Sequence, residues 1–175
     1  ALYRTIPGMT VLHPCDDLST ADLTVQLLEH NQPSYTRTAR NKTPRLYDED
    51  SSRSLKLGKG SILRDGEDVA IIACGVMVYK AMKVADILQA DGISTTVIDM
   101  HTIKPLDTEL VSDLARRCNG IVTVEDHSVI GGLGSAVASH LSTTNPTRIK
   151  MLGVDDRFGE SGGSEELLKL MSLDI

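Results

Sequence analysis

The chain has 175 residues, of which 41% are hydrophobic and 24% charged, as in a globular chain of one ordinary domain or one domain with an appendage. Its formal net charge of −6 argues against nucleic acid as the main partner, because a basic stripe is the usual footprint of such proteins. No apolar run approaches the roughly 20 residues that a membrane-spanning helix needs, so we expect no membrane partner.

Residues 1–54 contain few predicted elements: a strand at 10–12, a helix at 21–30 that Asp16, Asp17 or Ser19 can cap, and a strand at 35–38. Residues 41–54 are polar and interrupted by Pro44, which predicts a linker. We therefore divide the chain into residues 1–54 and residues 55–175. The first part is too small to bury a core of its own, so we expect further polypeptide before Ala1.

Residues 55–175 alternate between strands and helices. An edge strand at 56–63 ends at Asp65-Gly66, a turn signal that predicts a hairpin with the strand at 69–74. The remaining predicted elements are a helix at 76–90, a strand at 93–98, a helix capped by Asp107, a strand at 121–124, a helix at 133–141, a strand at 148–154 and a helix from Ser164. This order predicts a three-layer α/β/α fold with a mostly parallel sheet and an antiparallel edge strand, preceded by an incomplete α/β segment.

The three cysteines, Cys15, Cys74 and Cys118, form no C-x-x-C pair. Their odd number and wide spacing argue against a disulfide framework or a zinc site. We interpret Cys74 and Cys118 as buried thiols, which suits a reducing cytoplasm.

The strand at 121–124 runs into Glu125-Asp126-His127, and the glycine-rich turn 131–134 then opens a helix. In open α/β sheets, ligands gather at the carboxyl ends of strands. A histidine beside carboxylates can be tuned for acid–base work near neutral pH. Alternatively, these three residues fix the strand-to-helix turn or form a contact between domains. The glycines could bind an anion at a helix N-terminus, but Val137 stands where a dinucleotide fingerprint needs its third glycine, so we favour close helix–strand packing.

The whole chain resembles the distal part of transketolases. The matching segments, in family order and spacing, are Leu2–Met9, His13–Asp16, Tyr35–Arg40, Asp68–Gly75, Ile103–Asp107, Val124–His127, Gly131–Val137, Asp156–Gly162 and Glu165–Leu168. The resemblance implies that residues 1–54 are the end of a thiamine pyrimidine-binding domain with its linker, and that residues 55–175 are a transketolase C-terminal domain. The chain looks most similar to the C-terminal subunit of split, two-chain transketolases.

The resemblance implies a transferase of pentose phosphate metabolism that moves a two-carbon ketol unit between sugar phosphates with thiamine diphosphate and a divalent metal, Mg or Ca. In the family, the metal motif G-D-G…N belongs to an N-terminal domain, and nothing here matches it. The activating glutamate lies before Ala1 in the family pattern. We therefore expect no catalytic, cofactor-binding or metal-binding residue on this chain, and a chain that is inactive alone. Its partner would be an N-terminal cofactor-binding domain or subunit, in a homo-oligomer or heterotetramer.

Arg40 is the expected substrate-binding residue. A guanidinium offers a planar fork of donors that fits phosphate oxygens, and the resemblance implies that the arginine at this position binds the substrate phosphate. The simpler alternative is a surface arginine paired with an acid. Arg37 falls on the opposite face of the strand by the period of two, so we interpret it as structural. Because the chemistry of the family belongs to other domains, we also favour a structural role for Glu125, Asp126 and His127.

Two other functions remain open from the sequence. The chain could come from a related thiamine enzyme, either a deoxyxylulose-phosphate synthase or the β subunit of a 2-oxo-acid dehydrogenase. It could also be a non-catalytic module that docks a subunit through its strand ends. The Asp156–Gly162 segment favours transketolase.

Overall fold

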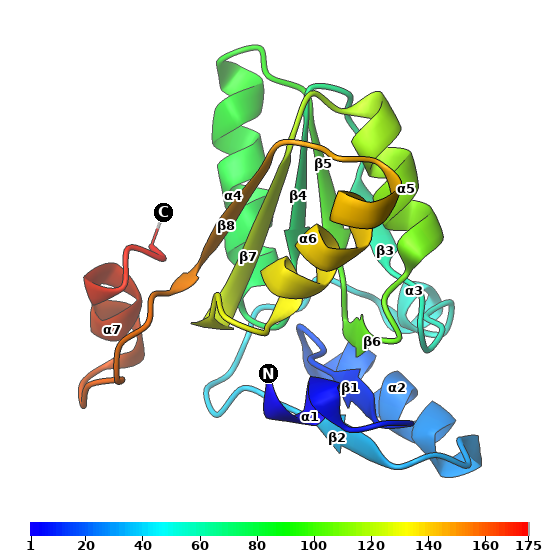
Figure 1. Cartoon of the computed structure of the whole chain (residues 1–175). Coiled ribbons are helices and arrows are strands. Elements are labelled where there is room, and N and C mark those ends of the chain that lie inside the picture. Colours follow the sequence, from blue (N-terminus) through cyan, green and yellow to red (C-terminus); the bar gives the residue numbers. More distant parts are fainter. Residues whose placement is uncertain (175) are drawn as a thin grey trace.

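A computed structural model describes residues 1–174 as two sheets with flanking helices (Figure 1). The larger sheet has the strand order β3-β5-β4-β7-β8. Its strands are β3 (Ser61–Arg64), β4 (Val69–Ala73), β5 (Thr95–Asp99), β7 (Ile121–Ser128) and β8 (Ile149–Val154). All adjacent pairs are parallel except β3 and β5. The predicted fold class, a mostly parallel sheet with an antiparallel edge strand, is confirmed.

Helices cover the two faces of this sheet. Helix α4 (Met77–Ala90) lies on one face, and α5 (Thr108–Arg117) and α6 (Leu133–Thr144) lie on the other (Figure 1). Side chains of β4 alternate between the two layers: Ala70 and Ile72 pack in the cluster with α5 and α6, whereas Ile71 packs toward α4. The short helix α7 (Ser164–Leu170) lies beyond β8. A parallel sheet needs such cover because both of its faces are apolar.

The predicted hairpin between β3 and β4 is wrong. Strand β3 pairs with β5 instead, with Ile62 opposite Ile98, and β5 lies between β3 and β4. The segment after β3 crosses the end of β5, where the amide of Gly66 donates to the Thr96 hydroxyl (3.0 Å) and the Thr96 hydroxyl donates back to the Gly66 carbonyl (2.5 Å). Strand β4 is apolar on both faces, and such a strand belongs in the interior of a parallel sheet.

The first part of the chain forms most of the smaller sheet, which has the order β2-β1-β6. Its elements are α1 (Leu2–Thr5), β1 (Thr10–Leu12), α2 (Asp17–Glu29) and β2 (Ser34–Thr36). The third strand, β6 (Thr102–Lys104), comes from beyond residue 55 and pairs antiparallel with β1. The expected linker contains a helical turn, α3 (Glu49–Ser52), which Asp48 caps by accepting from the Ser51 amide (2.8 Å).

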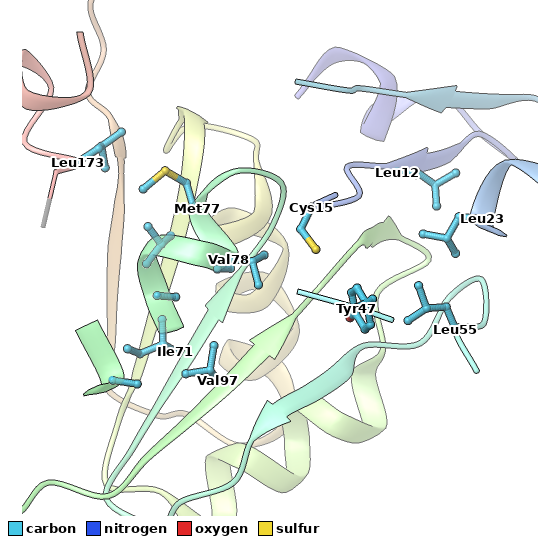
Figure 2. Close-up of a cluster of buried hydrophobic side chains, with 14 residues drawn as sticks. Leu12, Cys15, Leu23, Tyr47, Leu55, Ile71, Met77, Val78, Val97 and Leu173 are labelled. Atoms are coloured by element: carbon cyan, nitrogen blue, oxygen red, sulfur yellow. The ribbon is translucent and has the colours of Figure 1, made fainter. Parts of the chain in front are cut away.

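One hydrophobic cluster joins the two parts of the chain. Leu12, Leu23 and Tyr47 from the first part belong to the same buried cluster as Ile71 and Val97 from the large sheet (Figure 2). The first part lies at the end of the large sheet to which β4 and β7 point (Figure 1). It therefore closes the edge where α/β folds usually bind ligands. No helix within residues 1–174 is long and apolar enough to cross a membrane.

Candidate functional site

Backbone hydrogen bonds connect β1 to the carboxyl ends of β4 and β5. The amide of Gly75 donates to the His13 carbonyl (3.0 Å), and the amide of His13 donates to the His101 carbonyl (2.8 Å). Gly75 has a φ of +57°, and a Cβ there would overlap the His13 ring, so only glycine allows this approach. Burial lowers the pKa of His13 to about 3, and this ring is neutral near pH 7.

Glu125 caps α6. Its buried carboxylate accepts hydrogen bonds from the amides of Leu133 and Gly134, both at 2.8 Å. A Cβ on Gly132 would overlap this carboxylate, and a Cβ on Gly134 would press on Thr123 and Met151. The glycine-rich turn therefore serves close packing around Glu125. Because the anion position at the helix N-terminus holds the chain's own carboxylate, a phosphate or diphosphate does not fit there.

Asp126 forms an ion pair between the two parts of the chain. The Arg37 guanidinium donates from Nη1 to Oδ1 (3.0 Å) and from Nη2 to Oδ2 (2.8 Å), a two-point contact. Burial raises the pKa of Asp126, and the charge of Arg37 acts in the opposite direction. The sequence predicts a structural role for Arg37, and an ion pair that joins the two parts of the chain fits this role.

His127 is partly exposed and lies between Glu125 and the N-terminus of the chain. Its Nδ1 lies 2.7 Å from the Ser128 carbonyl oxygen and 3.5 Å from a carboxylate oxygen of Glu125, and its Nε2 lies 3.2 Å from the Ala1 nitrogen. Glu125 and His127 line a cavity of only about 50 Å³, which Asp126 does not reach. The structure therefore does not gather all three side chains around one open position for a sugar phosphate.

Arg40 lies on an exposed loop after β2, which ends at Thr36, so the expected place at the strand end is corrected. Its guanidinium pairs with no side chain of residues 1–174. Beside this loop is a groove of about 580 Å³ between the loop and the start of α2. The polar residues that line the groove are Asp16, Asp17, Thr20, Thr38, Asn41, Lys42, Thr43 and Arg45.

Asp16 ties the far end of this loop to α2. Its Oδ1 accepts from the Ser19 amide (2.8 Å) and hydroxyl (2.7 Å), which caps the helix. Its Oδ2 accepts from the amides of Leu46 (2.8 Å) and Tyr47 (3.0 Å). The sequence offered Asp16, Asp17 and Ser19 as candidate caps. It did not reveal the second pair of contacts, because these depend on residues distant in the chain.

Asp99 is a buried acid that the sequence analysis missed. Its Oδ2 accepts from the Tyr47 hydroxyl at 3.0 Å, and its Oδ1 has no partner within residues 1–174. Burial raises the pKa of Asp99 to about 7. Burial also raises the pKa of the nearby Cys15 thiol, which keeps it protonated and unreactive. The only signal in the sequence is one acid directly after the apolar run of β5.

Metal ligands do not cluster in the part of the chain that the structure describes. Within residues 1–174, no group of three or more His, Cys, Asp or Glu side chains could hold an ion. The N-terminus of α6 holds Glu125 instead of an anion. The described residues therefore do not fit a metal-bound diphosphate cofactor.

These features define an α/β fold in which the first part of the chain covers the end of the large sheet to which β4 and β7 point (Figure 1). A family model described as "Transketolase, C-terminal domain" matches residues 58–175. The chain belongs to the transketolase family.

The similar proteins include separate subunits of transketolases. A putative transketolase C-terminal section from Methanocaldococcus jannaschii is 40% identical over 175 residues, which cover 99% of this chain and 54% of that protein. One of the subunits of an apulose-4-phosphate transketolase from Phocaeicola vulgatus is 38% identical over 99% of this chain and 55% of its own length. The chain thus spans about half the length of these relatives.

A solved structure is also similar. It is described as a split gene transketolase, inactive beta4 tetramer, and matches with a TM-score of 0.95 and 40% identity over 99% of this chain and 56% of that chain. A 1-deoxy-D-xylulose-5-phosphate synthase from Geobacter sulfurreducens is 36% identical over 98% of this chain and 27% of its own length. The wider family therefore includes more than one reaction.

Proposed function

We propose that this chain is the C-terminal part of a transketolase that transfers a two-carbon ketol unit between sugar phosphates. The observation that carries the proposal is the 40% identity, over nearly the whole chain, with a transketolase C-terminal section. In this proposal the chain contributes substrate contacts and a subunit interface. It is inactive alone.

The cofactor belongs to a partner in this proposal. Thiamine diphosphate with Mg or Ca would supply the chemistry of ketol transfer, and it would be held by an N-terminal domain or subunit. The start of α6, which holds the Glu125 carboxylate, supports this division, because a diphosphate would compete with that carboxylate for the same amides. So does the description of the similar tetramer of β chains as inactive, which is said of that protein. The complete enzyme would be a homo-oligomer or a heterotetramer.

Arg40 would bind the substrate phosphate. Its exposure on a loop, with no side-chain partner among residues 1–174, supports this role. Lys42 lines the groove beside this loop, whereas Arg45 is paired with Asp17. We place the assembled enzyme in the cytoplasm, since all three cysteines are free and buried.

The test is a reconstitution assay with the matching N-terminal part. This chain, the N-terminal part and their mixture are each given thiamine diphosphate, magnesium, a ketose phosphate donor and an aldose phosphate acceptor. We expect transfer only in the mixture. Transfer by this chain alone, or none in a mixture that forms a stable complex, would contradict the proposal.

A second candidate is the synthase reaction, favoured by the 36% identity with a 1-deoxy-D-xylulose-5-phosphate synthase. Replacing the ketose phosphate donor with pyruvate in the same assay separates the two reactions. Product from pyruvate, with none from the ketose phosphate, would select the synthase.

A further inference from the structure

The loop that carries Arg40 is fixed at both ends by carboxylates of the large sheet. At the first end, the Arg37 guanidinium makes its two-point contact with Asp126 of β7. The Arg37 amide also donates to the Leu12 carbonyl at 2.9 Å, which extends the hydrogen bonding between β1 and β2 past the end of β2. The loop therefore leaves the small sheet from a fixed point.

At the second end, the anchor is Tyr47. Tyr47 is 7% exposed, and it packs in the joint cluster with Leu12 and Leu55 (Figure 2). Its hydroxyl donates to Asp99, the last residue of β5, at 3.0 Å. Its amide donates to Asp16. The loop therefore ends at a second fixed point.

Both acids lie toward the carboxyl ends of parallel strands, where side chains are held by the sheet rather than by mobile loops. Asp99 is fully buried, so its hydrogen bond with Tyr47 is shielded from water. A buried carboxyl group is costly unless it has partners. Apolar side chains would serve the core better at this position, so stability alone does not explain the acid.

We propose that Asp99 and Asp126 are positioning residues, and that the C-terminal domain serves the enzyme by holding the Arg40 loop ready for the substrate phosphate. The inference rests on the proposed role of Arg40. A loop fixed before binding loses less conformational freedom when the phosphate arrives. Loosening the loop should therefore weaken binding of phosphorylated substrates more than it slows the chemical step.

The test uses Tyr47→Phe in the assembled enzyme. This variant removes the hydroxyl and keeps the buried ring. The net contribution of one hydrogen bond corresponds to a change of about 2- to 12-fold in a binding constant. We therefore expect KM for phosphorylated acceptors to rise by that factor. We expect kcat to stay within about twofold, and KM for an acceptor without phosphate to remain unchanged.

One variant serves as a control. Tyr79→Phe removes a hydroxyl from α4, far along the chain from the loop and without a hydrogen bond within residues 1–174, so its kinetics should be unaltered. Equal KM changes with both acceptor classes, or a fall in kcat alone, would overturn the inference.

Hydrogen exchange on this chain provides a readout that does not depend on activity. Tyr47→Phe should speed exchange at the amides of residues 38–47, including those of Leu46 and Tyr47 that Asp16 holds, and leave α6 unchanged. Unaltered exchange in the loop would overturn the anchoring. If Arg40→Ala itself does not discriminate between acceptors, the proposed function of Arg40 fails. If it does but Tyr47→Phe does not, only the positioning inference fails.

Discussion

Arg40 combines exposure with a guanidinium that no side chain of residues 1–174 neutralises. In the proposed function it makes a charge-assisted contact with the substrate phosphate. Such a bond is worth about 1.5–3 kcal/mol, which corresponds to a loss of roughly 10- to 150-fold in kcat/KM. We predict that Arg40→Ala in the assembled enzyme loses this much with phosphorylated substrates and much less with substrates that lack the phosphate.

The matched control for Arg40→Ala is Arg116→Ala. Arg116 is an exposed arginine on α5 that pairs only with Asp113 of the same helix among the residues that the structure describes. It should leave both kinetic constants unchanged. Equal losses with both substrate classes in Arg40→Ala would show that Arg40 supports the fold or the subunit contact instead.

Asp99 should make stability depend on pH. Its pKa is about 7 in the folded chain and roughly 3.9 when unfolded. Between these values the folded state binds a proton that the unfolded state releases, so the free energy of unfolding falls as the pH rises, by up to about 1.4 kcal/mol per pH unit. Burial lowers the pKa values of His13 and His101, which act in the opposite sense below about pH 6.5.

Comparison with Asp99→Asn isolates the contribution of Asp99. We predict that this variant gains stability relative to the unaltered chain as the pH rises from 4 to 7, by a few kcal/mol in total. Urea unfolding at each pH measures the difference. If the difference in the free energy of unfolding between the two chains is constant across this range, Asp99 is ionised throughout, and the prediction is wrong.

The sequence predicted the structural role of some residues but not of others. Arg37 was interpreted as structural from the period of a strand, and it forms the Asp126 ion pair. Asp99 was not predicted, because one acid at the end of an apolar strand gives no sign of its burial without the segment that covers it. The Tyr47 contact that gives Asp99 a partner joins positions 47 and 99, a distance that local patterns do not report.

The packing around the start of α6 leaves little room for an added side-chain atom. A Cβ on Gly132 would overlap the Glu125 carboxylate that caps the helix. We predict that Gly132→Ala lowers the free energy of unfolding by about 1–3 kcal/mol, the usual cost of overpacking. Gly159→Ala is the control, since a Cβ there meets nothing within 4 Å. Equal melting temperatures for the two variants would contradict this account of the turn.

The sequence predicted the five longer helices and the parallel strands, since most of their apolar residues follow the spacing that burial against a sheet requires. The short helices α1 and α3 were not predicted. Pairing was harder to predict. The Asp65-Gly66 signal falls in the segment between β3 and β4, yet this segment is not a hairpin turn, because β5 lies between the two strands. Strand β6 was not expected either. It is short, and it forms only because β1 offers a partner edge.

At the scale of the whole molecule, the chain is held together by contacts between its two parts. The joint cluster around Leu12 and Tyr47, the Arg37–Asp126 ion pair and the pairing of β1 with β6 all cross the expected boundary near residue 54. A sequence pattern can suggest where a linker lies, but it does not report how the segments on either side pack.

The central claim is that this chain needs a partner to bind the cofactor. Calorimetry with thiamine diphosphate and magnesium tests it most directly, with this chain alone and with its complex with the matching N-terminal part. We predict no saturable heat for the chain alone and saturable binding by the complex. Micromolar binding by the chain alone would contradict the account.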